Sequence, residues 1–360
     1  MPDQNPPSDD LLRVLCGPAS MADLTDAQWD ALLPRARDCR CLARLAAAAR
    51  TYGLVDLPGA VRNHLDGATV EATQGERIIR WELNRIARAL EPLSVPVLLL
   101  KGAAYSAMEL PFAKGRLASD VDIMVPRETL LDVENALLQA GWEPTKLEPY
   151  DQRYYRTWMH ELPPLRHSER GTFLDVHHTI LPPTARLKPD PDQLWSRARR
   201  LARSRLHVLA PADMVLHSAA HLFHDGDLNR SLRDLVDVRD LLGYFGTDSS
   251  FWHDLVPRAA TLHLGRPLFY ALRYCQELLR LDSPEEVMAA AAAFAPPVPI
   301  LAVMDQLVPR TLVPREKRVP TDHAAMMLLY MRSHWLRMPP GLLVPHLARQ
   351  AVARFVNSPH

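Results

Sequence analysis

Apolar residues in the N-terminal quarter of the chain recur at the spacing of an α-helix. Thr25 stands three residues before Gln28 and opens an apolar-periodic run, which is the signature of a helix N-cap. Residues 39–52 are rich in Ala, Leu and Arg, the residues of a stable helix. Residues 58–93 predict one long amphipathic helix. Its apolar positions are Val70, Ile78, Ile79, Leu83, Ile86 and Leu90.

Short apolar runs replace this helical pattern between residues 94 and 210. The clearest run predicts a buried strand at 95–100. Further strands are predicted at 119–125, 171–177 and 206–209, and weaker ones at 142–146 and 158–167. Helices are predicted at 103–110 and at 127–140, the latter ended by Gly141. These elements together predict a small mixed sheet with helices beside it.

The pattern becomes helical again at Pro211 and stays so to the end of the chain. The predicted helices are 212–224, 228–244, 251–262, 267–279, 284–294 and a tail helix from about Thr321. We therefore expect an N-terminal helical region at 1–93, an α/β core at 94–210 and a C-terminal helical domain at 211–360. The predicted fold class is α+β, a small mixed β-sheet core flanked by N-terminal and C-terminal helical regions.

Composition narrows the classes of function. Lysine plus arginine and aspartate plus glutamate balance at 42 each in 360 residues, and this neutrality disfavours long nucleic acid as a partner. The four cysteines contain no C-x-x-C pair, so neither a disulfide framework nor a zinc ribbon is predicted. The sequence begins without the basic-then-apolar order of a signal peptide, and no apolar run approaches transmembrane length. We expect a cytoplasmic protein with no membrane partner.

Two aspartates carry the main chemical signal. Asp120 and Asp122 lie one residue apart in a predicted strand, so their side chains share one face. Adjacent carboxylates repel unless a cation lies between them, and oxygen ligands favour Mg²⁺ or Mn²⁺. Asp175, inside the apolar strand at 171–177, completes a triad if the two strands are neighbours. The alternatives are a solvated Asp120–Asp122 pair and an Asp175 paired with an arginine.

Groups that bind phosphate are predicted beside these carboxylates. Lys101 and Gly102 follow the first strand, where a cation and backbone N–H groups can bind phosphate oxygens. Arg116, shortly before the second strand, is placed to help. The alternative for Lys101 is a surface lysine that caps a loop. The whole pattern points to phosphoryl or nucleotidyl transfer.

The same segments resemble a known family. Leu100-Lys101-Gly102, Arg116, Ser119-Asp120-Val121-Asp122 and Leu174-Asp175-Val176-His177 are similar to the bacterial uncharacterised nucleotidyltransferases, a family of the DNA polymerase β-like nucleotidyltransferase superfamily. The likeness extends over roughly residues 90–245.

This resemblance implies roles for individual residues. Asp120 and Asp122 would be metal ligands, Asp175 the third acid that activates the acceptor, and Gly102 the phosphate-loop glycine. Ala103 stands where the superfamily has a serine, so that hydroxyl contact with the donor is absent. The expected cofactor is Mg²⁺ or Mn²⁺, and the expected donor is a nucleoside triphosphate.

Histidines form a second pattern. His217, His221 and His224 recur at helical spacing, and Asp225 follows, as in metal-dependent phosphohydrolases. A helix whose histidines line an interior groove is the preferred interpretation, because such metal sites take ligands from several elements. His217 or His221 can also contact substrate at the edge of the site. His177 shares a strand face with Asp175 and is placed to contact the carboxylates.

Three functions remain open at this stage. The first is Mg²⁺-dependent transfer of a nucleoside monophosphate from a nucleoside triphosphate to an acceptor hydroxyl or phosphate. The second keeps the fold but transfers a sugar from a nucleotide-sugar donor to a phosphorylated peptide or a saccharide. The third is a catalytically degenerate binding module or toxin–antitoxin partner. Intact Asp120, Asp122 and Asp175 argue for an enzyme.

Overall fold

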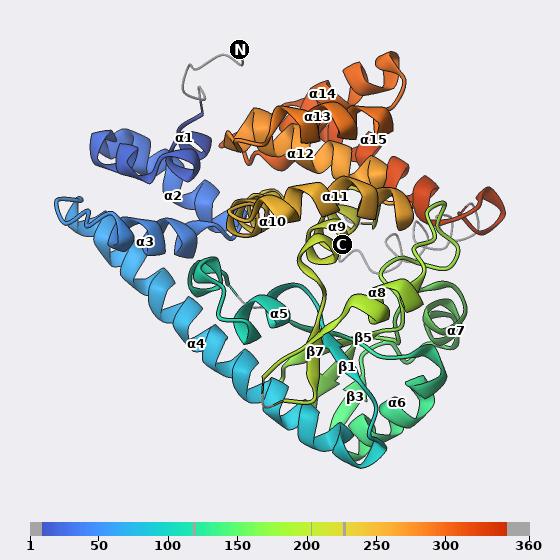
Figure 1. Cartoon of the computed structure of the whole chain (residues 1–360). Helices are drawn as coiled ribbons and strands as arrows, with labels where there is room; N and C mark the ends of the chain where they lie inside the picture. The colour runs from blue at the N-terminus through green and yellow to red at the C-terminus, as the bar shows by residue number, and fades with distance from the viewer. Residues whose placement is uncertain (1–8, 118–119, 203, 226–227, 344–360) are drawn as a thin grey trace, which may run out of the picture.

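A computed structural model describes residues 9–117, 120–202, 204–225 and 228–343. Figure 1 shows a long helix, α4 (Gly59–Leu90), that runs along one edge of the molecule from the other N-terminal helices to the sheet. In Figure 1 the helices after residue 211 lie above the sheet, and α5 (Lys101–Ala107) lies between them and α4. The predicted α+β class is confirmed, and the three-part division at residues 93 and 210 stays a prediction.

The N-terminal region is helical, as predicted. Its elements are α1 (Asp10–Cys16), η1 (Pro18–Asp23), α2 (Asp26–Asp38), α3 (Leu42–Thr51), α4 and η2 (Glu91–Leu93). A capping box starts α2: Thr25 Oγ1 accepts from the Gln28 amide, and Gln28 Oε1 accepts from the Thr25 amide at 3.0 Å. Helix α4 buries Ile79, Leu83, Ile86 and Leu90, whereas Val70 and Ile78 are exposed. The apolar face of α4 is thus narrower than the sequence pattern predicts.

Seven strands form one mixed sheet in the order β3-β4-β5-β2-β1-β7-β6. They are β1 (Val97–Leu99), β2 (Asp120–Met124), β3 (Trp142–Pro144), β4 (Leu165–His167), β5 (Phe173–His177), β6 (Arg199–Arg200) and β7 (Leu206–Val208). β2 runs antiparallel to β1 and parallel to β5. The interior strand β1 is buried along its whole length, as its continuous apolar run requires. Of the predicted strand 119–125, residue 119 lies outside the described residues.

The helices of the α/β region are α5 (Lys101–Ala107), α6 (Leu130–Gln139), α7 (Pro149–Trp158) and α8 (Pro191–Arg197), with short turns η3 (Pro111–Gly115) and η4 (Arg127–Thr129). The strand predicted at 158–167 is wrong over most of its length, because only Leu165–His167 forms a strand and Glu161 adds a single isolated bridge to His177. Helix α7 was not predicted, and none of its side chains is fully buried.

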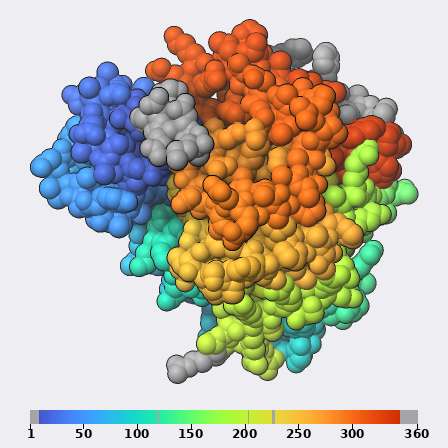
Figure 2. Space-filling model, turned by 45° about the horizontal axis from the view of Figure 1, so that its top comes forward, coloured from blue at the N-terminus to red at the C-terminus, as the bar shows by residue number. Residues whose placement is uncertain are grey.

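The C-terminal region comprises α9 (Pro211–Ala220), η5 (His221–Asp225), α10 (Leu232–Phe245), α11 (Ser249–Thr261), α12 (Gly265–Leu279), α13 (Glu285–Ala291), η6 (Ala292–Phe294), α14 (Val298–Leu312) and α15 (Pro320–Arg337). The helix predicted at 212–224 is α-helical only to Ala220 and continues as the π-helix η5. Helix α14 was not among the predicted segments. In Figure 2 the helices after Gly265 form a continuous face beside the N-terminal helices.

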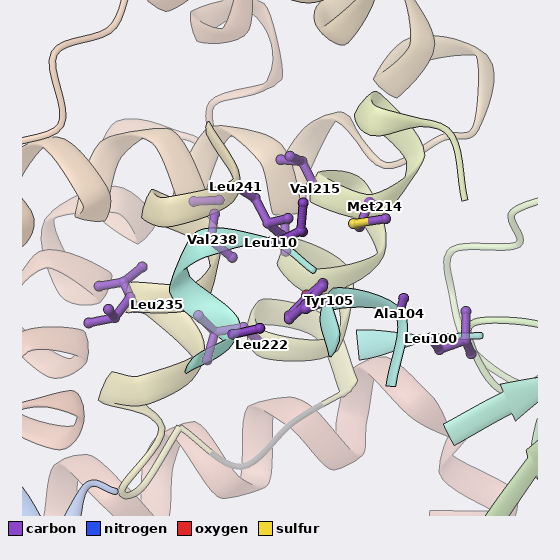
Figure 3. Packing of buried hydrophobic residues seen from close by; sticks show 14 of the residues in the cluster. Leu100, Ala104, Tyr105, Leu110, Met214, Val215, Leu222, Leu235, Val238 and Leu241 are labelled. Atoms are coloured by element: carbon purple, nitrogen blue, oxygen red, sulfur yellow. The ribbon is translucent and has the colours of Figure 1, made fainter. Parts of the chain in front are cut away.

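The sheet region and the C-terminal helices share an apolar core. Tyr105 of α5 is fully buried, and its hydroxyl lies 2.8 Å from Ser218 Oγ of α9. In Figure 3, Tyr105 and Leu110 lie below Val215 of α9, and Val238 of α10 lies to their left. This packing holds α5 against α9. Because α5 begins at Lys101, directly after β1, the packing also fixes the position of this lysine. Burial of these side chains contributes about 1.5–3 kcal/mol each.

No described helix is by itself long and apolar enough to cross a membrane. The segments Glu285–Phe294 and Val298–Leu312 reach that length and apolarity only when taken together, with a bend of 111° between them.

Candidate active site

Two parallel strands bring the predicted carboxylates together. β2 places Asp120 and Asp122 on one face, and the β2–β5 register sets Asp122 directly opposite Asp175. One carboxylate oxygen from each of the three aspartates lies within 4.8 Å of the others. Asp122 is buried, whereas Asp120 and Asp175 are partly exposed. The structure therefore assembles the triad that the sequence pattern predicted, with an open side at Asp120 and Asp175.

Lys101 supplies positive charge to the triad. Its Nζ donates a hydrogen bond of 2.9 Å to Asp122 Oδ1, so it is not a surface lysine that caps a loop. Burial alone would raise the pKa of Asp122, but Lys101 and then His177 hold it well below its usual range. The Lys101 backbone lies in the left-handed region with φ of 43°, a conformation that costs about 1 kcal/mol in a non-glycine residue. Such conformations concentrate at functional sites.

The charge on Asp175 is compensated only in part, by His177. Burial and the negative charges of Glu161, Asp122 and Asp120 raise the pKa of Asp175 to about 7. The single lysine therefore does not balance the carboxylates that converge here. A divalent cation is the group that such a set of oxygen ligands accommodates.

His177 and Glu161 extend the site on the β5 side. His177 Nε2 donates to Asp122 Oδ1 at 3.2 Å, because an ionised carboxylate can only accept. Its Nδ1 lies 3.4 Å from Glu161 Oε2, and its ring centroid lies 5.1 Å from that of His160. His160, Glu161 and His177 form a second group whose ligand atoms lie within 4.8 Å of one another. The predicted contact of His177 with the carboxylates is thus found.

The sequence analysis did not identify Glu161 and His160. Both lie in the loop between α7 and β4, where Glu161 makes an isolated bridge with His177. No periodicity marks such a bridge. The one available signal was a pair of ionisable residues, His160-Glu161, inside the apolar stretch that was predicted as a strand.

Of the three histidines at helical spacing, His217 and His221 face the site and His224 does not. Burial, then the positive charges of Lys101 and His177, lower the pKa of His217 to about 3. Lys101 is the largest cause of the lowered pKa of His221. The change from α-helix to π-helix at His221 breaks the predicted helical stripe, and His224 lies instead among Arg332, Arg337 and Arg186. The histidines therefore do not form one row along a helix.

Gly102 and Arg116 contact each other. A Cβ on Gly102 would overlap Arg116 Nη1 and lie 2.9 Å from its Cζ. The Arg116 Nε donates a hydrogen bond of 2.8 Å to Asp237 Oδ2 of α10, and its guanidinium lies 5.7 Å from the Tyr105 ring centroid. Asp237 also pairs with Arg44 of α3. Because Gly102 has no Cβ, the guanidinium of Arg116 can lie against the start of α5. A buried ion-pair network holds Arg116 in this position.

Comparison with known proteins agrees with this geometry. A family model described as an uncharacterised nucleotidyltransferase matches residues 25–280 of the 360, a wider span than the motifs alone indicated. It includes every residue of the acidic triad, Lys101, Gly102 and Arg116. No curated protein and no solved structure gives a significant match to the chain.

Proposed function

The chain belongs to the uncharacterised nucleotidyltransferase family and is thus a transferase, and we propose that it is a Mg²⁺-dependent enzyme of the DNA polymerase β-like superfamily. It moves a nucleoside monophosphate from a nucleoside triphosphate to an acceptor hydroxyl or phosphate and releases pyrophosphate. The observation that carries the proposal is the register that sets Asp122 opposite Asp175, with Asp120 on the same face. We also propose action in a reducing compartment, the cytoplasm, since the four cysteines are free thiols.

The triad fits a divalent cation. Its members are hard oxygen ligands from two rigid strands, and their mutual repulsion, seen in the raised pKa of Asp175, is what a bound cation relieves. When bound between Asp120, Asp122 and Asp175, Mg²⁺ or Mn²⁺ would polarise the α-phosphate and neutralise charge on the leaving pyrophosphate.

The chain's own residues then account for the other parts of the reaction. Lys101 lies against Asp122 and presents a cation to the phosphate oxygens of the donor. Asp175 orients the acceptor and takes its proton as the new bond from the acceptor oxygen to the α-phosphorus forms. The bond from the α-phosphorus to the bridging oxygen breaks, and pyrophosphate leaves. His177 holds the Asp122 carboxylate in place through Nε2.

The acceptor is the least defined part of this function. A phosphorylated peptide or a saccharide is the acceptor class that we propose to test first. Sugar transfer from a nucleotide-sugar donor to such an acceptor is the second candidate reaction. Asp120 and Asp175 are partly exposed, so an acceptor of either kind would approach the triad from their side.

The decisive experiment incubates the protein with each α-labelled nucleoside triphosphate, Mg²⁺ and a panel of phosphorylated peptides and saccharides. Label on the acceptor together with released pyrophosphate supports nucleotidyl transfer. Parallel reactions with nucleotide sugars are examined by mass spectrometry, since a nucleotide adds phosphorus to the acceptor and a hexose does not. Absence of metal-dependent transfer from every donor would contradict the proposal.

A further inference from the structure

A cavity lies in the C-terminal helical region. Its volume is about 660 Å³, within the range of small-molecule sites. It is enclosed by the loop before α8, the π-helix η5 and helices α12, α14 and α15, and most of its wall is apolar. Ile300, Val303 and Leu328 at its rim are about half exposed, at 52%, 52% and 51%. Exposed apolar side chains that converge on a cavity mark a binding site more often than a free surface.

Three arginines line the same cavity: Arg186, Arg266 and Arg332. Arg332 donates a hydrogen bond of 2.8 Å to the Phe223 carbonyl oxygen and lies 5.5 Å from the Tyr270 ring centroid. Arg186 donates to the Trp335 carbonyl oxygen at 3.2 Å, and its guanidinium lies 4.6 Å from that ring. Arg266 donates to a backbone carbonyl of Phe294. Within the described residues, none of the three forms an ion pair with a carboxylate.

These cations make the cavity positively charged. Burial lowers the pKa of Arg332, which shows that its charge is desolvated without a full counter-charge. Burial and the charges of Arg332, Arg337 and Arg186 lower the pKa of His224 to about 4, so this imidazole stays neutral in their field. Arginine guanidinium groups beside aromatic rings bind carboxylate or phosphate strongly, because each offers paired donors in one plane.

We propose that this cavity is a binding site for an amphiphilic anion, a molecule with an apolar body and one carboxylate or phosphate head. The apolar wall accommodates the body, and the arginines pair with the head. A metal cation is disfavoured by the charge, and a free nucleotide by the apolar wall. Residues 344–360 of the chain carry Arg349 and Arg354 but no acidic side chain, so charge complementarity does not favour them as the occupant.

The cavity and the acidic triad meet at η5. His221, the first residue of this π-helix, faces Lys101, while His224, three residues on, lines the cavity. Binding in the cavity does not rest on the proposed transfer reaction, and the two can be tested separately. A bound anion would contact the element that also borders the triad.

Isothermal titration calorimetry on the full chain, without nucleotide or metal, tests the proposal. The probes are decyl phosphate and decanoate, below the concentrations at which they aggregate. Methyl phosphate, which lacks the apolar body, and decyltrimethylammonium, which carries the opposite charge, are the controls. We expect saturable binding of at least one decyl anion and none of either control. The preferred anion identifies the head group.

Variants locate the binding. Arg332→Met and, separately, Arg186→Met should weaken binding at least about ten-fold, the effect of one lost charge-assisted contact. Arg186 is exposed, so its variant keeps the fold even if Arg332→Met does not. Arg77→Met, an exposed arginine of α4, is the matched control and should bind as wild type. Asp122→Asn should also bind as wild type, which separates this site from the transferase site. No binding of either anion, equal binding of the cationic probe, or wild-type affinity in Arg186→Met would overturn the proposal.

Discussion

Asp122 on β2 lies directly opposite Asp175 on the parallel strand β5, and the two carboxylates share one face of the sheet. This register places the negative charge of Asp122 next to that of Asp175, in a region from which water is partly excluded. Lys101 pairs with Asp122 and not with Asp175, and burial together with the charges of the neighbouring carboxylates raises the pKa of Asp175 to about 7. A cation that binds between these carboxylates relieves their repulsion and stabilises the site, and this relationship underlies the first prediction.

Replacement of Asp122 by asparagine should abolish transfer. Asn removes one anionic ligand and the negative charge that pairs with Lys101, so we expect turnover to fall by at least about 10²–10³-fold. The measurement is the initial rate of pyrophosphate release at saturating Mg²⁺. Thermal unfolding of the same variant shows whether the fold persists. Asp132→Asn, at an exposed position of α6, is the matched control and should retain full activity. Wild-type turnover in Asp122→Asn would exclude Asp122 as a metal ligand.

Addition of one methyl group at Gly102 should disturb the site through Arg116. A Cβ at position 102 overlaps the Arg116 guanidinium, which cannot withdraw freely because Asp237 holds its Nε at 2.8 Å. We expect Gly102→Ala to destabilise the protein by about 1–3 kcal/mol, the usual cost of overpacking. Urea denaturation measures the free energy of unfolding.

Gly67→Ala gives the control for this experiment. Gly67 lies in α4, and nothing lies within 4 Å of a Cβ built there. Alanine at this position should stabilise the helix by about 0.5–1 kcal/mol, the opposite sign to Gly102→Ala. If both variants were stabilised alike, Arg116 would not pack against Gly102 in solution.

Local pattern was sufficient to predict the triad but not its surroundings. Alternation of period two placed Asp120 and Asp122 on one face, and an aspartate inside an apolar strand identified Asp175. The family resemblance added the order of the elements. These signals are local, and the neighbouring strand needed only to pair in parallel for the triad to form.

Long-range contacts explain what the sequence analysis did not find. Arg116 was predicted to bind phosphate, yet its nearest carboxylate is Asp237, 121 residues later in the chain, and no local pattern records such a pair. Glu161 reaches the site through a single bridge to His177. The π-helix at His221 shifts the side chains by part of a turn, which helical periodicity cannot anticipate.

The buried network around Asp237 should be a main determinant of stability. Asp237 joins Arg116, which precedes β2, to Arg44 of α3, and all three side chains are less than a tenth exposed. Asp237→Asn removes the ionised partner of Arg116 and one of the two carboxylates that pair with Arg44, the other being Asp240, so we expect a loss of about 3–5 kcal/mol. Urea denaturation at neutral pH provides the measurement. Glu76→Gln breaks the exposed pair with Arg80 and should cost less than about 1 kcal/mol. A similar loss in both variants would show that the buried network contributes no more than a surface pair.

His224 should make the protein sensitive to mild acid. The unfolded chain binds a proton on this imidazole near pH 6.5, whereas burial and the charges of Arg332, Arg337 and Arg186 hold the folded pKa at about 4. The unfolded state therefore binds more protons between these values, and the free energy of unfolding falls as the pH is lowered from about 6.5 to about 4, by up to about 3 kcal/mol. His224→Gln removes this contribution, so its free energy of unfolding should fall less steeply over the same interval. The slope is compared, not the absolute stability, because glutamine also alters packing. His253→Gln, at an exposed position of α11, is the control and should keep the wild-type slope. An unchanged slope in His224→Gln would show that the His224 imidazole is not held neutral in the fold.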